Sequence, residues 1–542
     1  MYFQECEHLA SKYLDMKEII ERIDEFLKTC GPSYVLRTEI VAEKLNLNSV
    51  HVTNIFQLLA EKELLKSEQR IEHDCGELVA LKDYLKAKED QDPLECPKCG
   101  ENIIARCLNE VTIYRLAARS LKKKEDPHHP LRSSLPLNFR QNLPASLLND
   151  PFQDSHLLRY YSSQVGDLGK EKPFKGKRML FILHFLRDLV PFVIACEKLG
   201  METENAAFFY KDYPYPQKEA LKEWLLGRKA TVLNRFQHET YLNQLVRTST
   251  ESIGEILIVE DGGFLVPSIY RKFTNLISYV VGAVEQTTRG VWNDQECAKE
   301  GHDLQFPILS VATCKLKGDF EPPYIAEAAL RNIERMLPDI SLRGQSVAVL
   351  GYGTIGNKVA NSLRGRGMNV IVFDTNSDNI LKARQEGFQV HNSAAEAVQN
   401  KNLVVGASGN RSIDSSVIAN LDHGTIILST SSELYEIDME ELEKQKQSSK
   451  EYINDEQCIG TLFKLPPNGK EIVVLANGYP INFWGLDSMP NQASDLILSL
   501  LLLCAAEVAL KRHQKGINET AVNEISKKYE LSKKFTEFHQ SK

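Results

Sequence analysis

The residues with the clearest chemical meaning are three glycines and an aspartate. The glycines follow the apolar run Ser346–Leu350 at a spacing of two and then three residues: Gly351, Gly353 and Gly356. In a strand–turn–helix unit, this spacing allows a tight turn, a close approach of the backbone to a pyrophosphate and close packing of the helix on the sheet. Thr354 and Ile355 begin that helix, whose free N–H groups would face the phosphates.

Asp374 completes the pattern. It stands 18 residues after Gly356, directly behind a second apolar run, Asn369–Phe373. A carboxylate at this place accepts hydrogen bonds from a ribose 2′-hydroxyl and repels a 2′-phosphate. The sequence therefore predicts that NAD, rather than NADP, is bound.

The size and composition are those of an ordinary globular chain. A length of 542 residues predicts about three to four domains. The net charge of −8 gives no general attraction to nucleic acid or to an anionic membrane. Eleven cysteines, with no secretory signal at the start, indicate reduced thiols, so we expect a cytoplasmic protein. Glu507 interrupts the apolar run 497–510, which favours a buried or subunit-interface helix over a membrane span.

Residues 1–90 have the pattern of a small helical domain with a β-hairpin. Helical periodicity covers 16–27, 38–45 and 50–65, with Ser49 as the expected cap of the third helix, and polar strands follow at 65–72 and 78–81. This order resembles a winged-helix domain. The region carries 12 basic and 18 acidic side chains, and its third helix has no arginine. Packing or protein contacts are therefore favoured, and DNA binding is the less favoured alternative.

Residues 91–170 contain a possible zinc knuckle and a linker. Cys96 and Cys99 have the Cys-x-x-Cys spacing with which two thiolates hold one ion, and His73 and Cys75 could complete a tetrahedral structural site. Cys107 is a competing ligand, and unliganded thiols are the other interpretation. From 121 to about 161, Lys, Pro and Ser residues predict a linker or an extended arm.

An α/β pattern begins near residue 171. Strands are predicted at 178–183, 255–260 and 276–282 in a first lobe, 171–335, and at 346–350, 369–373, 403–406 and 425–428 in a Rossmann lobe, 336–480. Helices alternate with these strands, so we predict two doubly wound lobes with a cleft between them. Residues 481–542 are expected to be returning helices, with 494–510 as the candidate surface of a homo-oligomer.

The segment from about Lys175 to Leu510 resembles the S-adenosylhomocysteine hydrolase family. Several segments match the family's motifs in the same order: Leu183-His184 before a helix that ends in Leu199-Gly200, Glu260-Asp261-Gly262-Gly263, Glu285-Gln286-Thr287-Thr288-Arg289-Gly290, Thr313–Tyr324 and Ile481-Asn482. Enzymes of this family hold NAD, oxidise the 3′-hydroxyl of the substrate ribose, eliminate homocysteine, add water and return the hydride.

The resemblance also implies roles for individual residues. His184, Asp261 and Lys317 would be catalytic, with Lys317 in the place of the family's base beside the 3′-hydroxyl. A lysine base must lose its proton, which a desolvated pocket near a cationic nicotinamide ring favours. Three further residues would lie at the nicotinamide end of NAD: Thr287, Thr288 and Asn482.

The departures from the family pattern are concentrated on the substrate side. Gln286 replaces a substrate-binding glutamate, Glu321-Pro322 replaces an Asp-Asn pair, and Arg289 stands where the family has a third threonine. Two histidines of the family are missing, because the matching segments read Ser431-Ser432-Glu433 and Ser488-Met489-Pro490. The family's Lys/Tyr tail, which completes the NAD site of a neighbouring subunit, has no clear match in 526–535. The loss of several cooperating groups is expected to abolish the original reaction.

Two hypotheses follow from these patterns. In the first, the protein is a divergent enzyme that uses NAD to oxidise a hydroxyl of another nucleoside-like ligand, and it does not hydrolyse S-adenosylhomocysteine. In the second, it is a catalytically inactive sensor or effector subunit, in which nucleotide binding closes the lobes and acts on a protein partner through the winged-helix region. A transcription regulator is a third and weaker possibility.

Overall fold

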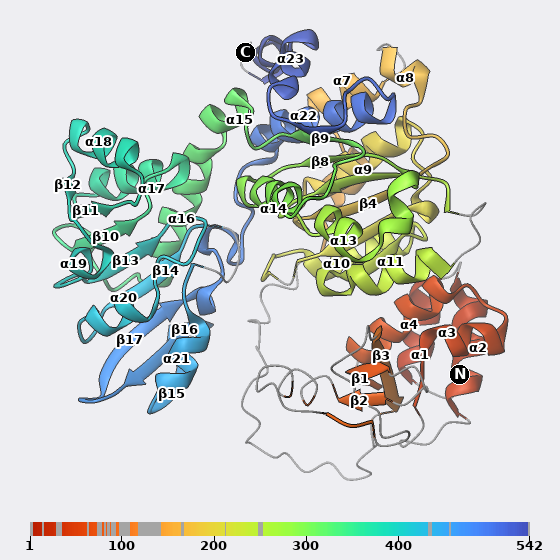
Figure 1. The fold of residues 1–542 in the computed structure, drawn as a ribbon, viewed down its shortest axis with the longest axis horizontal. Helices are drawn as coiled ribbons and strands as arrows, with labels where there is room; N and C mark the ends of the chain where they lie inside the picture. Colours follow the sequence, from red (N-terminus) through yellow and green to blue (C-terminus); the bar gives the residue numbers. More distant parts are fainter. Residues whose placement is uncertain are drawn as a thin grey trace. The chain divides into compact units, whose positions relative to one another are not determined.

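The computed structural model describes most of the chain. The described residues are 4–13, 16–28, 35–61, 64–72, 78–80, 83, 87, 94–96, 109–116, 142–163, 167–211, 213–247, 253–431, 436–454 and 457–539. They form two compact units (Figure 1). The first unit comprises Met1–Leu131, Thr203–Phe209 and Glu223–Ser252, and the second comprises Arg132–Glu202, Tyr210–Lys222 and Ile253–Lys542.

Among the residues that the structure describes, the N-terminal part of the first unit contains four helices and a three-stranded antiparallel sheet. The elements are α1 (Gln4–Lys12), α2 (Lys17–Lys28), α3 (Thr38–Leu45), α4 (Ser49–Glu61), β1 (Leu65–Glu72), β2 (Leu78–Ala80) and β3 (Asn109–Leu116). The strand order is β2-β1-β3. The predicted helices and hairpin are present, whereas the sequence pattern did not indicate β3. The winged-helix assignment itself stays a prediction.

The third helix, α4, is packed rather than exposed. Its polar residues Thr53 and Asn54 are buried, and Asn54 Nδ2 donates to the carbonyl of Ala230 at 3.3 Å within the same unit. Side chains held in this way do not face outward to read the edges of bases. The prediction that Ser49 caps this helix is wrong, because Asn48 Oδ1 accepts a hydrogen bond from Val50 N–H at 2.8 Å and Ser49 is the first helical residue.

Besides β4 (Lys177–Leu183) and two short 3₁₀ helices, the described residues between 167 and 247 form six further elements. They are α8 (Asp167–Glu171), α9 (Leu189–Lys198), β5 (Ala207–Tyr210), α10 (Lys218–Leu226), β6 (Thr231–Asn234) and α11 (His238–Arg247). Of these, β6 and α11 belong to the first unit, whereas α8 and α9 belong to the second.

The first lobe of the second unit is built on parallel strands. In spatial order they are β18 (Gly516–Asn518), β9 (Pro307–Ser310), β8 (Val280–Glu285), β7 (Glu255–Glu260) and β4 (Lys177–Leu183). The helices α13 (Leu265–Lys272) and α14 (Thr288–Lys299) connect successive strands. The strand predicted from Leu276 starts only at Val280, because residues 274–279 form a 3₁₀ helix.

The second lobe is a Rossmann fold, as predicted. The spatial order of its strands is β12 (Gln389–Val390), β11 (Asn369–Phe373), β10 (Ser346–Leu350), β13 (Leu403–Gly406), β14 (Ile426–Ser429), β17 (Lys470–Leu475), β16 (Gln457–Leu465) and β15 (Ser448–Asn454). The first six strands run parallel, and β16 and β15 add an antiparallel edge. The helices are α15 (Lys315–Phe320), α16 (Pro322–Met336), α17 (Thr354–Gly365), α18 (Ser377–Gln385), α19 (Ala394–Ala397), α20 (Ser415–Asn420) and α21 (Met439–Gln445).

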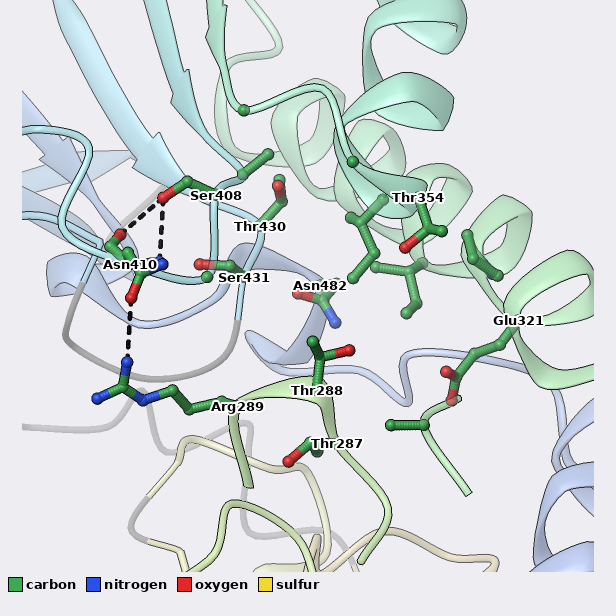
Figure 2. A pocket seen from close by; sticks show the side chains of 18 of the residues that line it. Thr287, Thr288, Arg289, Glu321, Thr354, Ser408, Asn410, Thr430, Ser431 and Asn482 are labelled. Atoms are coloured by element: carbon green, nitrogen blue, oxygen red, sulfur yellow. Dashed lines mark hydrogen bonds between the residues drawn. The ribbon is translucent and has the colours of Figure 1, made fainter. Parts of the chain in front are cut away.

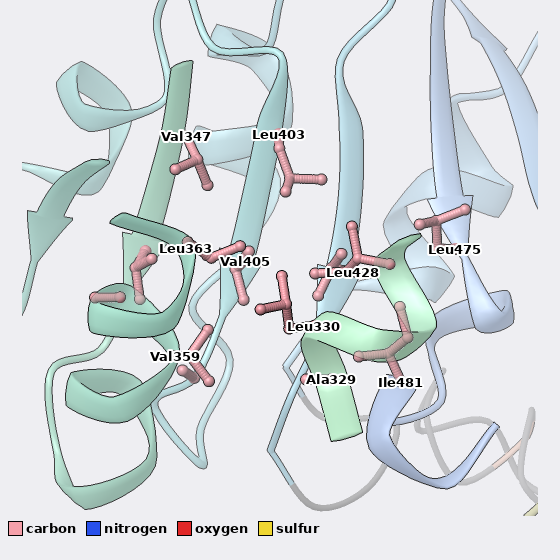
Figure 3. Close-up of a cluster of buried hydrophobic side chains, with 14 of the residues drawn as sticks. Ala329, Leu330, Val347, Val359, Leu363, Leu403, Val405, Leu428, Leu475 and Ile481 are labelled. Atoms are coloured by element: carbon pink, nitrogen blue, oxygen red, sulfur yellow. The ribbon is translucent and has the colours of Figure 1, made fainter. Parts of the chain in front are cut away.

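Apolar strand residues explain why this sheet forms. Val347, Val405 and Leu428 lie on adjacent strands and pack on Leu330 of α16 and Val359 of α17 (Figure 3). All of these side chains are buried, which is typical of a parallel sheet covered by helices. The burial fixes the strand register and thus places the carboxyl ends of β10, β11, β13 and β14 along one edge.

Two predictions for the flanking segments are wrong. Part of the expected linker is helical, because α6 (Ala145–Asn149) and α7 (His156–Ser162) lie within it. The first N–H groups of α7, those of Leu157 and Leu158, donate to buried Asp495 at 2.7 and 3.0 Å. This carboxylate therefore anchors α7 to the C-terminal helix that contains it.

That helix, α22 (Asn491–Ala509), offers no free apolar face for the predicted oligomer surface at 494–510. It is long and apolar enough to cross a membrane, but 94% of the apolar stretch is buried inside the structure. The covering elements include α7, α9, α23 (Ala521–Lys528) and α24 (Leu531–His539). An oligomer would thus need another surface, and its existence stays a prediction.

Candidate functional site

One cavity of about 830 Å³ lies within the second unit, where the carboxyl ends of the strands of both lobes meet (Figure 2). This edge is where doubly wound sheets bind their ligands. Eleven of the twelve residues that the sequence predicted as catalytic or cofactor-binding line it: His184, Asp261, Thr287, Thr288, Lys317, Gly351, Gly353, Thr354, Ile355, Asp374 and Asn482. The structure thus brings together residues that are up to three hundred positions apart.

The glycine turn has the shape that a dinucleotide needs. Gly351 has a φ of 104°, and a Cβ on Gly356 would lie 2.0 Å from the Gly351 carbonyl oxygen, so Gly356 serves helix packing and does not line the cavity. A Cβ on Gly353 would meet nothing within 4 Å, although this residue lines the cavity. Within the described part of the chain, no side chain caps the N-terminus of α17, so its N–H groups are left for phosphate oxygens.

Asp374 is held at the end of β11 with room for one more hydrogen bond. Its Oδ2 accepts from Tyr352 N–H at 2.5 Å and from Asn379 Nδ2 at 3.1 Å, and its Oδ1 accepts from Asn376 N–H at 2.7 Å. A carboxylate offers about four acceptor positions. One position on Oδ1 therefore remains that could accept from a ribose hydroxyl, and the role of Asp374 stays a prediction.

Asn482 presents an unpaired acceptor at the other end of the cavity. Its Nδ2 donates to Ser488 Oγ at 2.9 Å, whereas its buried Oδ1 has no hydrogen-bond partner among the described residues. Unpaired buried acceptors are costly. A carboxamide such as that of nicotinamide supplies the missing N–H donor, so the residues present fit NAD at both ends.

Thr287 is positioned by a buried carboxylate. Glu285 Oε1 accepts from the Thr287 N–H and hydroxyl, each at 2.7 Å, and both carboxylate oxygens accept from the Gly262 and Gly263 N–H groups at 3.1 and 2.9 Å. Burial, together with the charges of Glu260 and Asp261, raises the pKa of Glu285 to about 8. The turn that carries Asp261 and the turn that carries Thr287 are thus tied to one side chain.

Asp261 and His184 belong to a buried chain that includes a lysine the sequence analysis missed. Lys211, fully buried, is paired with Asp261 Oδ1, and His184 Nε2 lies 3.3 Å from Asp261 Oδ2. Burial would raise the pKa of Asp261, but the cations of Lys211 and His184 outweigh it and hold that pKa well below its usual range. The only signal for Lys211 in the sequence is a lone lysine directly after the apolar strand β5, which is weak.

His184 is fully engaged by its surroundings. Its Nδ1 is hydrogen-bonded to the Tyr215 hydroxyl, and its ring stacks on Phe483 with the centroids 4.3 Å apart. With Asp261 at Nε2, neither ring nitrogen is left for a ligand in this arrangement. Phe483 follows Asn482 directly. One short segment therefore supplies both the residue that stacks on His184 and the residue predicted to contact nicotinamide.

Lys317 lies at the start of the second lobe and is nearly buried. Its Nζ donates to the Gln286 carbonyl at 2.7 Å and lies 3.1 Å from Glu321 Oε2, one helical turn away. Asp188 is a further cavity residue that the sequence analysis missed. Burial and the charge of Asp487 raise the pKa of Asp188 to about 7.

The predicted zinc site is largely outside the described residues. His73, Cys75 and Cys99 are among those left undescribed, as is the alternative ligand Cys107, and Cys96 is buried. Within the part of the chain that the structure describes, no three His, Cys, Asp or Glu side chains are grouped to hold a metal. Zinc therefore stays a prediction without support.

Comparison with known proteins gives a consistent family. Residues 324–485 match the model of the S-adenosyl-L-homocysteine hydrolase NAD-binding domain. The S-inosyl-L-homocysteine hydrolase of Methanopyrus kandleri is 30% identical over 255 residues, a match that spans 47% of this chain but only 58% of that protein. The adenosylhomocysteinase of Thermoplasma acidophilum is 26% identical over 347 residues, or 64% of this chain and 82% of that protein.

Among solved structures, the phosphoglycerate oxidoreductase of Vibrio cholerae aligns with 49% of this chain and 89% of its own. The sequence identity is 13% and the TM-score is 0.30, so this likeness carries no conclusion about the chain.

Proposed function

We propose that this chain, which belongs to the S-adenosylhomocysteine hydrolase family, is an NAD-using enzyme that acts on a nucleoside-like ligand other than S-adenosylhomocysteine. One observation carries the proposal: the residues suited to NAD and the polar set around Lys317 line the same cavity. The family supports NAD binding directly, whereas the ligand and the reaction are inferred from the site.

The cofactor would be held by the backbone N–H groups of α17, by Asp374 at its adenosine ribose, and by Thr287, Thr288 and Asn482 at its nicotinamide end. When bound, NAD supplies a hydride acceptor for a carbon that carries a hydroxyl group. The chain must then provide a group that takes the hydroxyl proton.

Lys317 and Glu321 are the pair best placed for this task. They lie at the cavity 3.1 Å apart, so a proton taken by the lysine amine could be shared with the carboxylate. Asp261 stays ionised beside Lys211 and is suited to accept a hydrogen bond from a second hydroxyl of the ligand. A polyhydroxylated ring, such as a ribose, satisfies both requirements.

Hydrolysis of S-adenosylhomocysteine is not part of the proposal. The resemblance assigns catalytic or substrate-binding roles to residues that are Gln286, Pro322, Ser432 and Met489 in this chain. Each loss in a cooperating set costs about 10²–10⁴ in rate. The wall of the cavity also includes the apolar side chains of Leu186, Ile325 and Met489, which suit a flat, uncharged ring.

The test starts with the nucleotides that the purified protein carries, identified by mass spectrometry after denaturation. The NAD-loaded protein is then mixed with a panel of nucleosides, and absorbance of reduced nicotinamide is recorded. Lys317→Ala should lower the rate of reduction by about 10²-fold or more without weakening NAD binding. Lys315→Ala is the matched control, because Lys315 is on the same helix, exposed, and paired with Asp319 outside the cavity. Reduction at equal rates in both variants would contradict the role of Lys317.

The second candidate function, a nucleotide sensor without catalysis, is favoured by the state of His184. Both of its ring nitrogens are hydrogen-bonded and its ring is stacked, so it has no group left for proton transfer to a ligand. In that case NAD binds, no nucleoside reduces it, and NAD changes the protease sensitivity of the first unit. A response of residues 1–90 would point to a protein partner there, which we favour over DNA.

The remaining expectations concern the cellular setting. We propose a cytoplasmic protein without a membrane span and a homo-oligomer, which sedimentation of the purified chain would test. The enzyme hypothesis requires no protein partner at residues 1–90. The sensor hypothesis does require one.

A further inference from the structure

We infer that Arg289 and Asn410 form a latch that retains NAD in the cavity, an inference that rests on the proposed binding of NAD. Arg289 comes from the first lobe and Asn410 from the second, and both line the cavity. Arg289 Nη1 donates to Asn410 Oδ1 at 3.0 Å, which Figure 2 shows as a hydrogen bond between the two lobes. Nothing in the sequence pattern indicates that these residues meet, since they are 121 positions apart.

The Asn410 side of the latch is rigidly supported. Asn410 N–H donates to Ser408 Oγ at 3.0 Å, and Ser408 Oγ donates to the Asn410 carbonyl at 2.9 Å, which closes a small turn. Glu436, a fully buried carboxylate, also holds this turn. It accepts hydrogen bonds from Ser408 N–H and Gly409 N–H, each at 3.0 Å. These bonds hold the backbone of Asn410, so its side-chain Oδ1 reaches Arg289 from a fixed turn.

The Arg289 side is supported by the turn that also carries the nicotinamide-end threonines. Thr287 caps α14 by accepting from Gly290 N–H at 3.0 Å, so Arg289 lies in the first turn of a capped helix. The resemblance gives a threonine at this position in the family, and a threonine side chain is too short to reach across as arginine does. The latch is thus a property of this chain.

The position of the latch determines what it does. The predicted NAD residues lie on both sides of it, with the glycine turn and Asp374 in one lobe and Thr287 and Thr288 in the other. NAD that bridges the lobes leaves only when they separate, and separation breaks the hydrogen bond between Arg289 and Asn410. Because a hydrogen bond of this kind contributes modestly, its loss should speed the release of NAD by about fivefold.

The experiment measures the exchange of bound NAD for isotopically labelled NAD on the full-length protein, followed by mass spectrometry. Arg289→Ala and Asn410→Ala should each release NAD about fivefold faster than the wild type. The double variant should be no faster than either single variant, because both remove the same interaction. Arg331→Ala is the control, since Arg331 is exposed on α16, pairs with Glu327 and does not line the cavity.

Each other outcome has a defined meaning. Wild-type rates in both single variants, or multiplied effects in the double variant, would overturn the latch. Faster release in Arg289→Ala alone would also overturn it and would mean that Arg289 acts through a contact other than that with Asn410. A wild type that binds no NAD would overturn the proposed function together with the latch, whereas a wild type that binds NAD but releases it like the variants would overturn only the latch.

Discussion

Asp294 should make the stability of the second unit depend on pH. It lies on α14, fully buried, and neither of its carboxyl oxygens has a hydrogen-bond partner among the described residues. Burial, reinforced by the nearby Glu260 and Glu285, raises the pKa of Asp294 well above its usual value. The folded protein therefore keeps a proton on this group at a pH at which the unfolded chain has released it.

The sign and size of the effect follow from that retained proton. An acid whose pKa is higher in the folded state loses stability as pH rises above the unfolded pKa, by about 1.4 kcal/mol per pH unit, until the folded pKa is passed. Between about pH 5.5 and 7.5 the loss is at most about 2.7 kcal/mol for one proton. Asparagine has a similar volume and no proton to keep, so Asp294→Asn should remove this contribution.

The assay is thermal unfolding of wild type and Asp294→Asn at both pH values. From the lower to the higher pH, the unfolding midpoint of the variant should rise relative to that of the wild type, by up to about 5 °C. Asp319→Asn is the control, because Asp319 is exposed and pairs with Lys315 at the surface, away from the buried carboxylates around Asp294. Parallel pH profiles for wild type and Asp294→Asn would refute the reasoning, since they would mean that Asp294 titrates alike in the folded and unfolded chain.

Three further predictions concern the cofactor site and the C-terminal helices. Gly356→Ala should lower the midpoint of thermal unfolding, because its Cβ would lie 2.0 Å from the Gly351 oxygen. Gly353→Ala should leave that midpoint unchanged and weaken NAD binding in calorimetry, because its methyl group projects into the cavity. The reverse result would contradict the assignment of the two glycines. Asp374→Ser should weaken NAD binding about tenfold or more, through loss of a charge-assisted hydrogen bond, and narrow the preference over NADP; an unchanged ratio of the two affinities speaks against a ribose contact. Asp495→Ala should expose α7 and α24 to proteolysis, because Asp495 accepts from the N–H groups of α7 and lies 2.8 Å from Nε2 of His539, which is on α24. A digestion pattern like that of the wild type would show that packing alone holds these helices.

The nucleotide lobe was predictable because its signals are local. Apolar runs of four to six residues, such as 346–350 and 403–406, form buried parallel strands, and the glycine turn with Asp374 lies within thirty residues of sequence. The helices 145–149 and 156–162 were missed because prolines and short lengths hide their periodicity. The second of them, 156–162, is stabilised by α22, more than three hundred residues away, through contacts such as that of Leu157 with Asp495.

The same distinction applies to the site. Short-range patterns in the sequence predicted the Rossmann lobe, the family resemblance and the candidate NAD residues, because these depend on residue types at fixed short spacings. Three contacts are visible only in the folded chain. Lys211 pairs with Asp261, His184 is held between Tyr215 and Phe483, and Arg289 donates a hydrogen bond to Asn410. These contacts join segments that are far apart in the chain, and their energies depend on burial and distance, which a linear pattern of residue types does not contain.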